Sequence, residues 1–123
     1  MPPATLNCLL LIASAKLTDM YVGIDIGGTK TLVAALDSNG VIKERVKFPT
    51  PKKYDEFLTE LKNTLSQFEH KDFKAGGLAV PGRIDHKKGT VIRLGNVRTW
   101  GNDIPLQHDV QNLCKCPIVM RND

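Results

Sequence analysis

Residues 21–31 read YVGIDIGGTKT, a short apolar stretch that runs into an acidic residue, two glycines, a hydroxyl and a cation. Glycines in a tight turn let backbone N–H groups approach an anion closely, and hydroxyl and ammonium groups can add further donors. We therefore interpret Gly27, Gly28, Thr29 and Lys30 as a turn that holds the phosphate groups of a nucleotide.

The carboxylate of Asp25, two residues before this turn, is a second feature of the stretch. A carboxylate beside a phosphate chain is repulsive unless a divalent cation lies between them, directly or through its water shell, as Mg²⁺ often does. Asp25 thus indicates a Mg²⁺-bound nucleotide. Taken alone, the stretch fits a plain hairpin with a glycine turn equally well. The Gly-x-x-x-x-Gly-Lys-Ser/Thr and Gly-x-Gly-x-x-Gly phosphate motifs are both absent.

The strands that surround the turn can be read from short apolar runs. Residues 21–26 and 31–36 predict two strands of a hairpin joined through the glycines. Ser38-Asn39-Gly40 is a second turn signal, after which residues 41–48 predict a third strand. We expect these three strands to be antiparallel.

A helix is predicted next, with Thr50 as its cap and Pro51 at its first position. Its apolar residues recur at helical spacing: Tyr54, Phe57, Leu58, Leu61, Leu65 and Phe68. Further strands are expected at residues 76–80, 90–94 and 117–120, with a short helix at 104–113. This order predicts a mixed α/β sheet whose later strands are parallel and joined by helical crossovers.

Composition limits the class of protein. The chain has 123 residues, of which 41% are hydrophobic and 24% charged, as in one soluble globular domain. The net charge of +4 is spread without any basic block longer than two residues, so we expect no nucleic-acid partner. We expect the histidines to lie on the solvated surface.

The three cysteines provide no disulfide framework and favour a reducing, cytoplasmic compartment. Cys114 and Cys116 form a C-x-C pair without a second pair, so we interpret them as packing residues rather than zinc ligands.

Residues 1–19 are interpreted as an extension outside the fold. The apolar run at residues 9–13 is preceded by no Lys or Arg and is far shorter than the roughly 18 residues that span a bilayer. We therefore expect neither export nor a membrane partner. Met20, directly before the first strand, is the expected natural start, and residues 1–19 are expected to add nothing to function.

The Asp25–Lys30 segment (DIGGTK) resembles the phosphate loop of the ROK family of sugar kinases and repressors, which belongs to the actin-like ATPase superfamily. Two further segments resemble the family in the same order: residues 78–85 (LAVPGRID) and 117–123 (PIVMRND). The resemblance covers residues 20–123. It implies a ribonuclease H-like (actin-like ATPase) α/β domain that forms the N-terminal lobe of a two-lobe protein.

The resemblance also implies roles for single residues. Asp123 would be the general base that takes the proton of the sugar hydroxyl attacking the γ-phosphate, as phosphoryl transfer requires. Asn122 would bind sugar hydroxyls, and Gly82 and Arg83 would line the sugar pocket. Asn96 lies near the Asn-Leu position of the family, although a valine replaces the leucine here.

Simpler interpretations are open for Asn122 with Asp123 and for Trp100. Asn122 and Asp123 could form a turn after a strand, because both residue types are common in turns. Trp100 could cover the sugar, yet a lone tryptophan more often packs in a core or at its rim.

The implied function is ATP-dependent phosphorylation of a hexose or amino sugar, with ATP, Mg²⁺ and the sugar as ligands. We expect a homo-oligomer to be possible for the complete protein. The family's second adenosine-binding loop, its later sugar contacts and its zinc motif have no counterpart in these 123 residues. We therefore expect an N-terminal fragment that is inactive alone.

Two alternative functions stay open. ROK transcriptional regulators share this lobe but place a DNA-binding helix-turn-helix before it, for which residues 1–19 are too short. A sugar- or nucleotide-binding module without turnover also fits the sequence.

Overall fold

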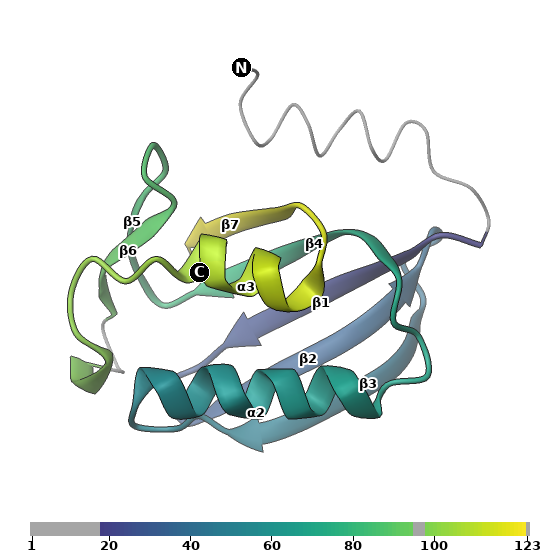
Figure 1. Cartoon of the computed structure of the whole chain (residues 1–123), viewed down its shortest axis with the longest axis horizontal. Helices are drawn as coiled ribbons and strands as arrows, with labels where there is room; N and C mark the ends of the chain where they lie inside the picture. The colour runs from purple at the N-terminus through teal and green to yellow at the C-terminus, as the bar shows by residue number, and fades with distance from the viewer. Residues whose placement is uncertain (1–17, 95–97, 123) are drawn as a thin grey trace.

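The structure is a computed structural model that describes residues 18–94 and 98–122 (Figure 1). The described strands are β1 (Met20–Ile26), β2 (Lys30–Asp37), β3 (Ile42–Pro49), β4 (Phe73–Val80), β5 (Gly82–Asp85), β6 (Thr90–Leu94) and β7 (Ile118–Asn122). The described helices are α2 (Tyr54–Gln67), α3 (Leu106–Cys114) and the 3₁₀ helix η1 (Arg98–Trp100).

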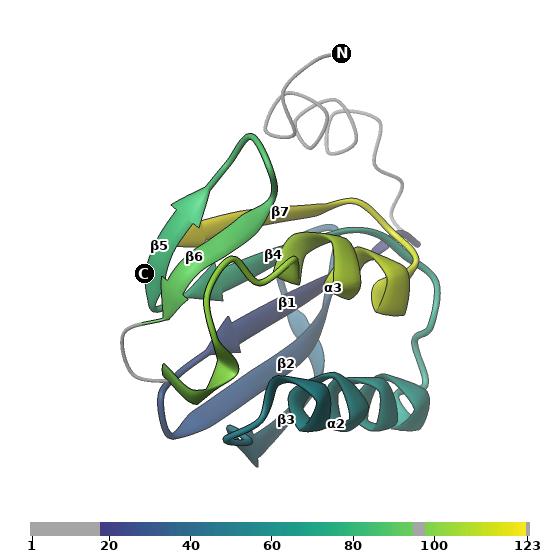
Figure 2. The ribbon, with the colours of Figure 1, turned by 60° about the vertical axis from the view of Figure 1, so that its left-hand side comes forward.

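The main sheet has five strands in the order β3-β2-β1-β4-β7. Strands β1, β2 and β3 pair antiparallel, whereas β4 pairs parallel with both β1 and β7. The antiparallel start and the parallel later strands, joined through α2 and α3, confirm the mixed sheet that the sequence predicts. Strands β5 and β6 form a separate hairpin beyond the carboxyl ends of β4 and β7 (Figure 2).

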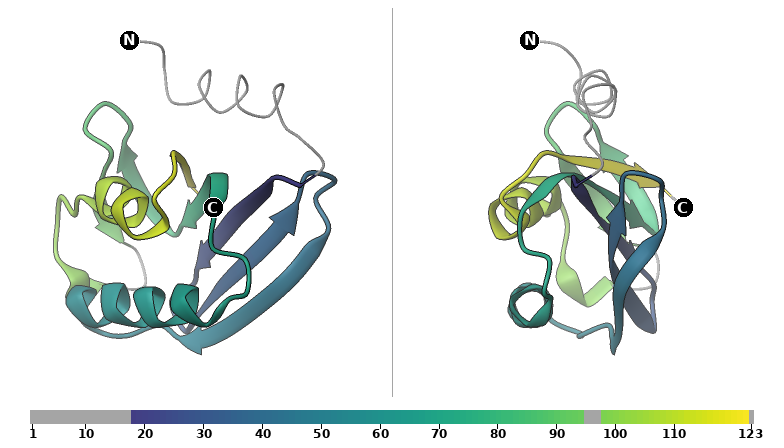
Figure 3. Two further views of the ribbon diagram at one scale, coloured as in Figure 1. Left: turned by 45° about the vertical axis from the view of Figure 1, so that its right-hand side comes forward. Right: turned by 90° about the vertical axis from the view of Figure 1, so that its right-hand side faces the viewer.

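Both helices pack against the same face of the sheet (Figure 3). Alternate residues of β1 are buried on this side, namely Val22, Ile24 and Ile26. An aromatic cluster joins the sheet to α2 and η1, and the ring centroids of Phe57 and Trp100 lie 4.6 Å apart. The core therefore lies between the sheet and the two helices.

The predicted start of the first helix is wrong. Helix α2 begins at Tyr54, and Lys53 occupies the N-cap position without a side-chain cap. The hydroxyl of Thr50 is unavailable as a cap because it donates a hydrogen bond to the carbonyl oxygen of Gly27. The buried face predicted for this helix is confirmed by Phe57 and Leu61, which are fully buried.

The second half of the fold differs from the expectation in its details. Strand β4 begins three residues earlier than predicted, and Gly82 starts a strand of its own, which the sequence did not indicate. A Cβ atom at Gly82 would lie 2.1 Å from the carbonyl oxygen of Arg93. Gly82 is therefore required by the close approach of β5 and β6. Ile104 lies before α3 and forms a bridge with Val91.

Contrary to the expectation of a solvated surface, His70 is half-buried and bound to Glu44. The Glu44 carboxylate accepts hydrogen bonds from the backbone N–H groups of Glu69 and His70 and contacts the His70 ring at 2.7 Å. These hydrogen bonds, first of all that of the His70 backbone, lower the pKa of Glu44 to about 2. The contact fixes the connection between α2 and β4 to strand β3.

Candidate phosphate-binding site

The hairpin between β1 and β2 forms the predicted turn. The backbone N–H of Gly27 donates to the carbonyl oxygen of Lys30 at 2.9 Å, and Gly28 and Thr29 form the two-residue loop between them. A Cβ atom at position 27 would lie 2.6 Å from that same oxygen, so the close approach requires glycine. Within the described part of the chain, the N–H groups of Gly28 and Thr29 have no hydrogen-bond partner. Two donors are thus available to an anion.

Thr50 holds the other side of this turn. Its N–H donates to the carbonyl oxygen of Thr29 at 2.9 Å, and its hydroxyl donates to that of Gly27 at 2.7 Å. The hydroxyls of Thr50 and Thr31 lie 2.8 Å apart. Because the single Thr50 hydroxyl proton is directed to Gly27, Thr31 is the donor in this pair. Thr50 therefore occupies the carbonyl oxygens of Gly27 and Thr29, whereas the N–H groups of Gly28 and Thr29 stay free.

Replacing Thr50 with valine should destabilise the protein by about 1 to 3 kcal/mol, because the fully buried Thr31 hydroxyl and the Gly27 carbonyl would lose their partner. Urea unfolding of the two proteins measures the change. Thr59→Ala is the matched control, since its hydroxyl bonds only to the exposed helix backbone. Equal free energies of unfolding for Thr50→Val and the unaltered protein would contradict the role of this hydroxyl.

Asp25 and Lys30 lie on the face of the sheet that the helices leave open. Asp25 is the exposed residue of β1 between buried Ile24 and Ile26, and Lys30 is exposed at the start of β2. One carboxylate, free backbone N–H groups and an ammonium group fit a Mg²⁺-bound phosphate chain, because Mg²⁺ usually takes few protein carboxylates and several oxygens from phosphate and water. These residues could hold both the metal and the nucleotide.

Three of the predicted sugar-binding residues, Gly82, Arg83 and Asn122, lie at or just beyond the carboxyl ends of β4 and β7, at the same end of the sheet as the turn. Asn122 is the last residue of β7 and stands opposite Val80, the last residue of β4. Gly82 and Arg83 follow β4 after a single proline. Since adjacent strands lie about 4.8 Å apart, the ends of β1 and β7 are separated by about 10 Å. Ligands of open α/β sheets bind at such carboxyl ends.

Two predicted site residues, Asn96 and Asp123, lie outside the described residues. Trp100 belongs to the core: it is only 6% exposed, and its indole N–H donates to the carbonyl oxygen of Pro51 at 2.8 Å. The packing interpretation of Trp100 therefore agrees with the structure.

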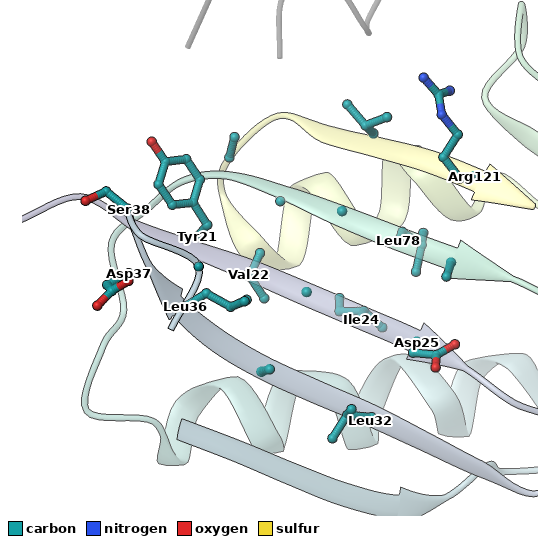
Figure 4. Close-up of a pocket in the computed structure, with 18 residues that line it drawn as sticks. Tyr21, Val22, Ile24, Asp25, Leu32, Leu36, Asp37, Ser38, Leu78 and Arg121 are labelled. Atoms are coloured by element: carbon teal, nitrogen blue, oxygen red, sulfur yellow. The ribbon is translucent and has the colours of Figure 1, made fainter. Parts of the chain in front are cut away.

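A groove of about 750 Å³ runs along the open face of the sheet (Figure 4). Its lining is mainly apolar and includes Tyr21, Leu36 and Gly77. Asp25, near the carboxyl end of β1, is the one residue of the predicted phosphate site among its lining residues. The groove is therefore a neighbour of the phosphate turn rather than the same site.

Sequence reasoning missed Thr50 as part of the turn and Arg121 as a charged residue of the open face. Arg121 stands opposite Ala79, which in turn stands opposite Asp25, so the three residues form one row across the strands. The register that creates this row depends on long-range pairing, for which the sequence carries no local signal.

Other features of the described residues are structural. Cys114 and Cys116 are buried, and burial raises the pKa of the two thiols to about 12 and about 11. No helix within the described residues, 18–94 and 98–122, has the length and apolar character needed to cross a bilayer.

The mixed sheet and its helices define an α/β domain of the ribonuclease H-like, actin-like ATPase class. The sequence matches the ROK family over residues 21–123, so the chain belongs to that family. The family resemblance carried by Asp25–Lys30 is thereby confirmed.

Relatives of this chain include named sugar kinases. A glucokinase of Halalkalibacterium halodurans is 32% identical over 111 residues, which cover 84% of this chain and 33% of the relative. An N-acetyl-D-glucosamine kinase of Citrobacter koseri is 32% identical over 107 residues, covering 85% of this chain and 35% of that kinase. The chain thus spans about a third of the length of these relatives.

Solved structures show the same fold. The ROK family glucokinase from Streptomyces griseus, in complex with glucose and AMPPNP, superposes with a TM-score of 0.72 at 29% sequence identity. The match covers 84% of this chain and 33% of that glucokinase.

Proposed function

We propose that this chain is the nucleotide-phosphate and sugar-hydroxyl lobe of an ATP-dependent kinase for a hexose or amino sugar. The observation that carries the proposal is the turn at Gly27–Lys30, which follows the strand that bears Asp25 and whose Gly28 and Thr29 N–H groups have no partner among the described residues. Membership of the ROK family and the relatives named glucokinase and N-acetyl-D-glucosamine kinase support it.

The phosphate side of the site would be formed by the turn at Gly27–Lys30 and the carboxylate of Asp25. The N–H groups of Gly28 and Thr29 would donate to phosphate oxygens, with the Thr29 hydroxyl and the Lys30 ammonium as further donors. Asp25 would hold Mg²⁺ directly or through water. When bound, Mg²⁺ would neutralise charge on the phosphate chain.

The sugar side would be formed at the ends of β4 and β7. Asn122 would bind sugar hydroxyls, with Gly82, Arg83 and Asn96 as further contacts. Asp123 would accept the proton of the attacking hydroxyl as general base, a role that suits a carboxylate at the end of a parallel strand. The separation of about 10 Å between the ends of β1 and β7 leaves room for the transferred phosphoryl group.

Turnover would require more than these residues. The chain spans about a third of the length of its kinase relatives. We propose that the other two thirds of such a kinase supply the adenosine contacts and exclude water from the site. The 123-residue chain alone should bind ligands weakly and show no sugar-dependent ATP consumption.

A titration of the ¹⁵N-labelled 123-residue chain with MgATP tests the phosphate site. We expect the amide signals of Gly28 and Thr29 to shift most, because their N–H groups are free. Asp25→Asn should weaken MgATP binding about tenfold, a loss of about 1.4 kcal/mol, and reduce the dependence of binding on Mg²⁺. Asp55→Asn, an exposed aspartate of α2, is the matched control.

The titration can also contradict the proposal. Signals that shift elsewhere while Gly28 and Thr29 stay unchanged would exclude this turn as the phosphate site. Equal MgATP affinity for Asp25→Asn and the control would exclude the metal role of Asp25.

A further inference from the structure

Two arginines stand directly opposite each other on the β5–β6 hairpin. Arg83 pairs with Arg93 in the antiparallel register, and both side chains are exposed. Residues in such a pair project from the same side of a ribbon, with Cβ atoms about 5 Å apart. Two positive charges at this separation repel each other and destabilise the pair unless a negative charge lies between them.

No carboxylate of the described residues forms an ion pair with Arg83 or Arg93. The ion pairs found in residues 18–94 and 98–122 are those of Lys43, His70 and Lys74, and none involves Arg83 or Arg93. The Asp85 carboxylate, two residues along β5, accepts hydrogen bonds from the N–H groups of Lys87 and Lys88 in the hairpin turn. Asp103, whose backbone bonds to Ile92, is exposed and makes no ion pair with either arginine.

The backbone keeps the two arginines together. Gly82 approaches β6 so closely that a Cβ atom would lie 2.1 Å from the carbonyl oxygen of Arg93. The neighbouring residues Val91 and Leu94 are fully buried and fix β6 to the core. The strands therefore cannot slide apart to relieve the repulsion without exposing buried side chains.

We infer that Arg83 and Arg93 form an anion-binding site whose ligand is the phosphate monoester of a phosphorylated sugar. A phosphate monoester carries a charge of about −1.5 to −2 at neutral pH, which matches two guanidinium groups. Each guanidinium can donate two parallel hydrogen bonds to a phosphate group. A carboxylate, with a single negative charge, would neutralise only one of the two arginines.

The position of the pair suggests the source of the phosphate. The hairpin lies beyond the carboxyl ends of β4 and β7, at the edge that bears Asn122 (Figure 2). This part of the inference rests on the proposed function: a sugar bound at Asn122 would carry a phosphoryl group after the reaction. The arginine pair would then hold the phosphate of the product.

Thermal unfolding of the 123-residue chain in low-salt, phosphate-free buffer tests the site. Inorganic phosphate and glucose 6-phosphate should each raise the melting temperature, whereas any effect of glucose should be unchanged by Arg93→Gln. Arg93→Gln and Arg83→Gln should each weaken the binding of both phosphates at least tenfold. Arg45→Gln is the matched control, because Arg45 is an exposed arginine on the opposite edge strand of the sheet.

The stability of the variants without phosphate gives a second readout. In the absence of phosphate, Arg93→Gln should be at least as stable as the unaltered protein, because the substitution removes a repulsion. A marked loss of stability without phosphate would show that Arg93 has a structural role and would overturn the inference. An equal loss of phosphate binding in Arg93→Gln and Arg45→Gln would also overturn it, since phosphate would then respond to net charge alone.

The two phosphate ligands separate the parts of the inference. Tighter binding of glucose 6-phosphate than of inorganic phosphate, by about fivefold or more, would support a site for a sugar phosphate; that factor corresponds to about 1 kcal/mol. Equal affinities would overturn the assignment to a product. The MgATP titration depends on Gly28 and Thr29, so failure of the proposed function and failure of the arginine site can be told apart.

Discussion

Alanine in place of Gly76 should lower the free energy of unfolding by about 3 kcal/mol or more, the upper range for an overpacked core. Gly76 lies in β4, an inner strand of the sheet that pairs with β1 on one side and β7 on the other. Its Cβ atom would lie 2.4 Å from Val22 Cγ1 and 2.6 Å from the Val22 carbonyl oxygen. A rotamer change can move the side-chain atom, but only a shift of β1 can move the oxygen.

The next residue provides the matched control. Gly77 faces the open side of the sheet, and a Cβ atom there would meet no atom within 4 Å. Gly77→Ala should therefore change stability by less than about 1 kcal/mol, since only the flexibility of the unfolded chain is altered. Urea unfolding of both variants measures the difference. Similar free energies of unfolding for Gly76→Ala and Gly77→Ala would contradict the tight packing of β1 against β4.

The first half of the fold could be predicted because its signals are local. The apolar runs on either side of Gly27 and Gly28 specify the first hairpin, and the Asn39-Gly40 turn specifies the next connection. Helical spacing identified the buried face of α2 correctly. Each of these features is set by residues close together in the sequence.

The errors have a different physical origin. Thr50 has the chemistry of a helix cap, yet its hydroxyl bonds to Gly27, which is 23 residues away in the sequence. The same residue type can satisfy either partner, and only the folded sheet decides between them. Likewise, Arg83 and Arg93 become a pair only through the register of β5 and β6, which shifts at Ile84.

These long-range contacts give the phosphate turn its shape. The sequence supplies the glycines, but the Thr50 hydroxyl and N–H occupy the carbonyl groups of Gly27 and Thr29. Both carbonyl oxygens thereby have partners, whereas the N–H groups of Gly28 and Thr29 have none among the described residues. An anion site at this turn therefore depends on the segment between β3 and α2 as much as on the DIGGTK residues themselves.

The largest effect is expected for Asp123 in a complete kinase. We propose a chimera in which this chain replaces the matched third of the Halalkalibacterium halodurans glucokinase, which is 32% identical to it. The chimera should consume ATP in the presence of glucose. Asp123→Asn in the chimera should lower kcat about 100- to 10,000-fold, the range expected when a general base is lost. An amide cannot accept the proton of the sugar hydroxyl.

Glucose binding separates a catalytic effect from a structural one. Asn has nearly the shape of Asp and keeps a hydrogen-bonding oxygen, so the variant should bind glucose with an affinity close to that of the parent chimera. Coupled measurement of ADP release, together with a glucose titration, checks both expectations. A folded Asp123→Asn chimera with undiminished kcat would remove Asp123 from its proposed role. A folded parent chimera that binds glucose and MgATP without turnover would contradict the proposal that this chain is the phosphate and sugar lobe of a kinase.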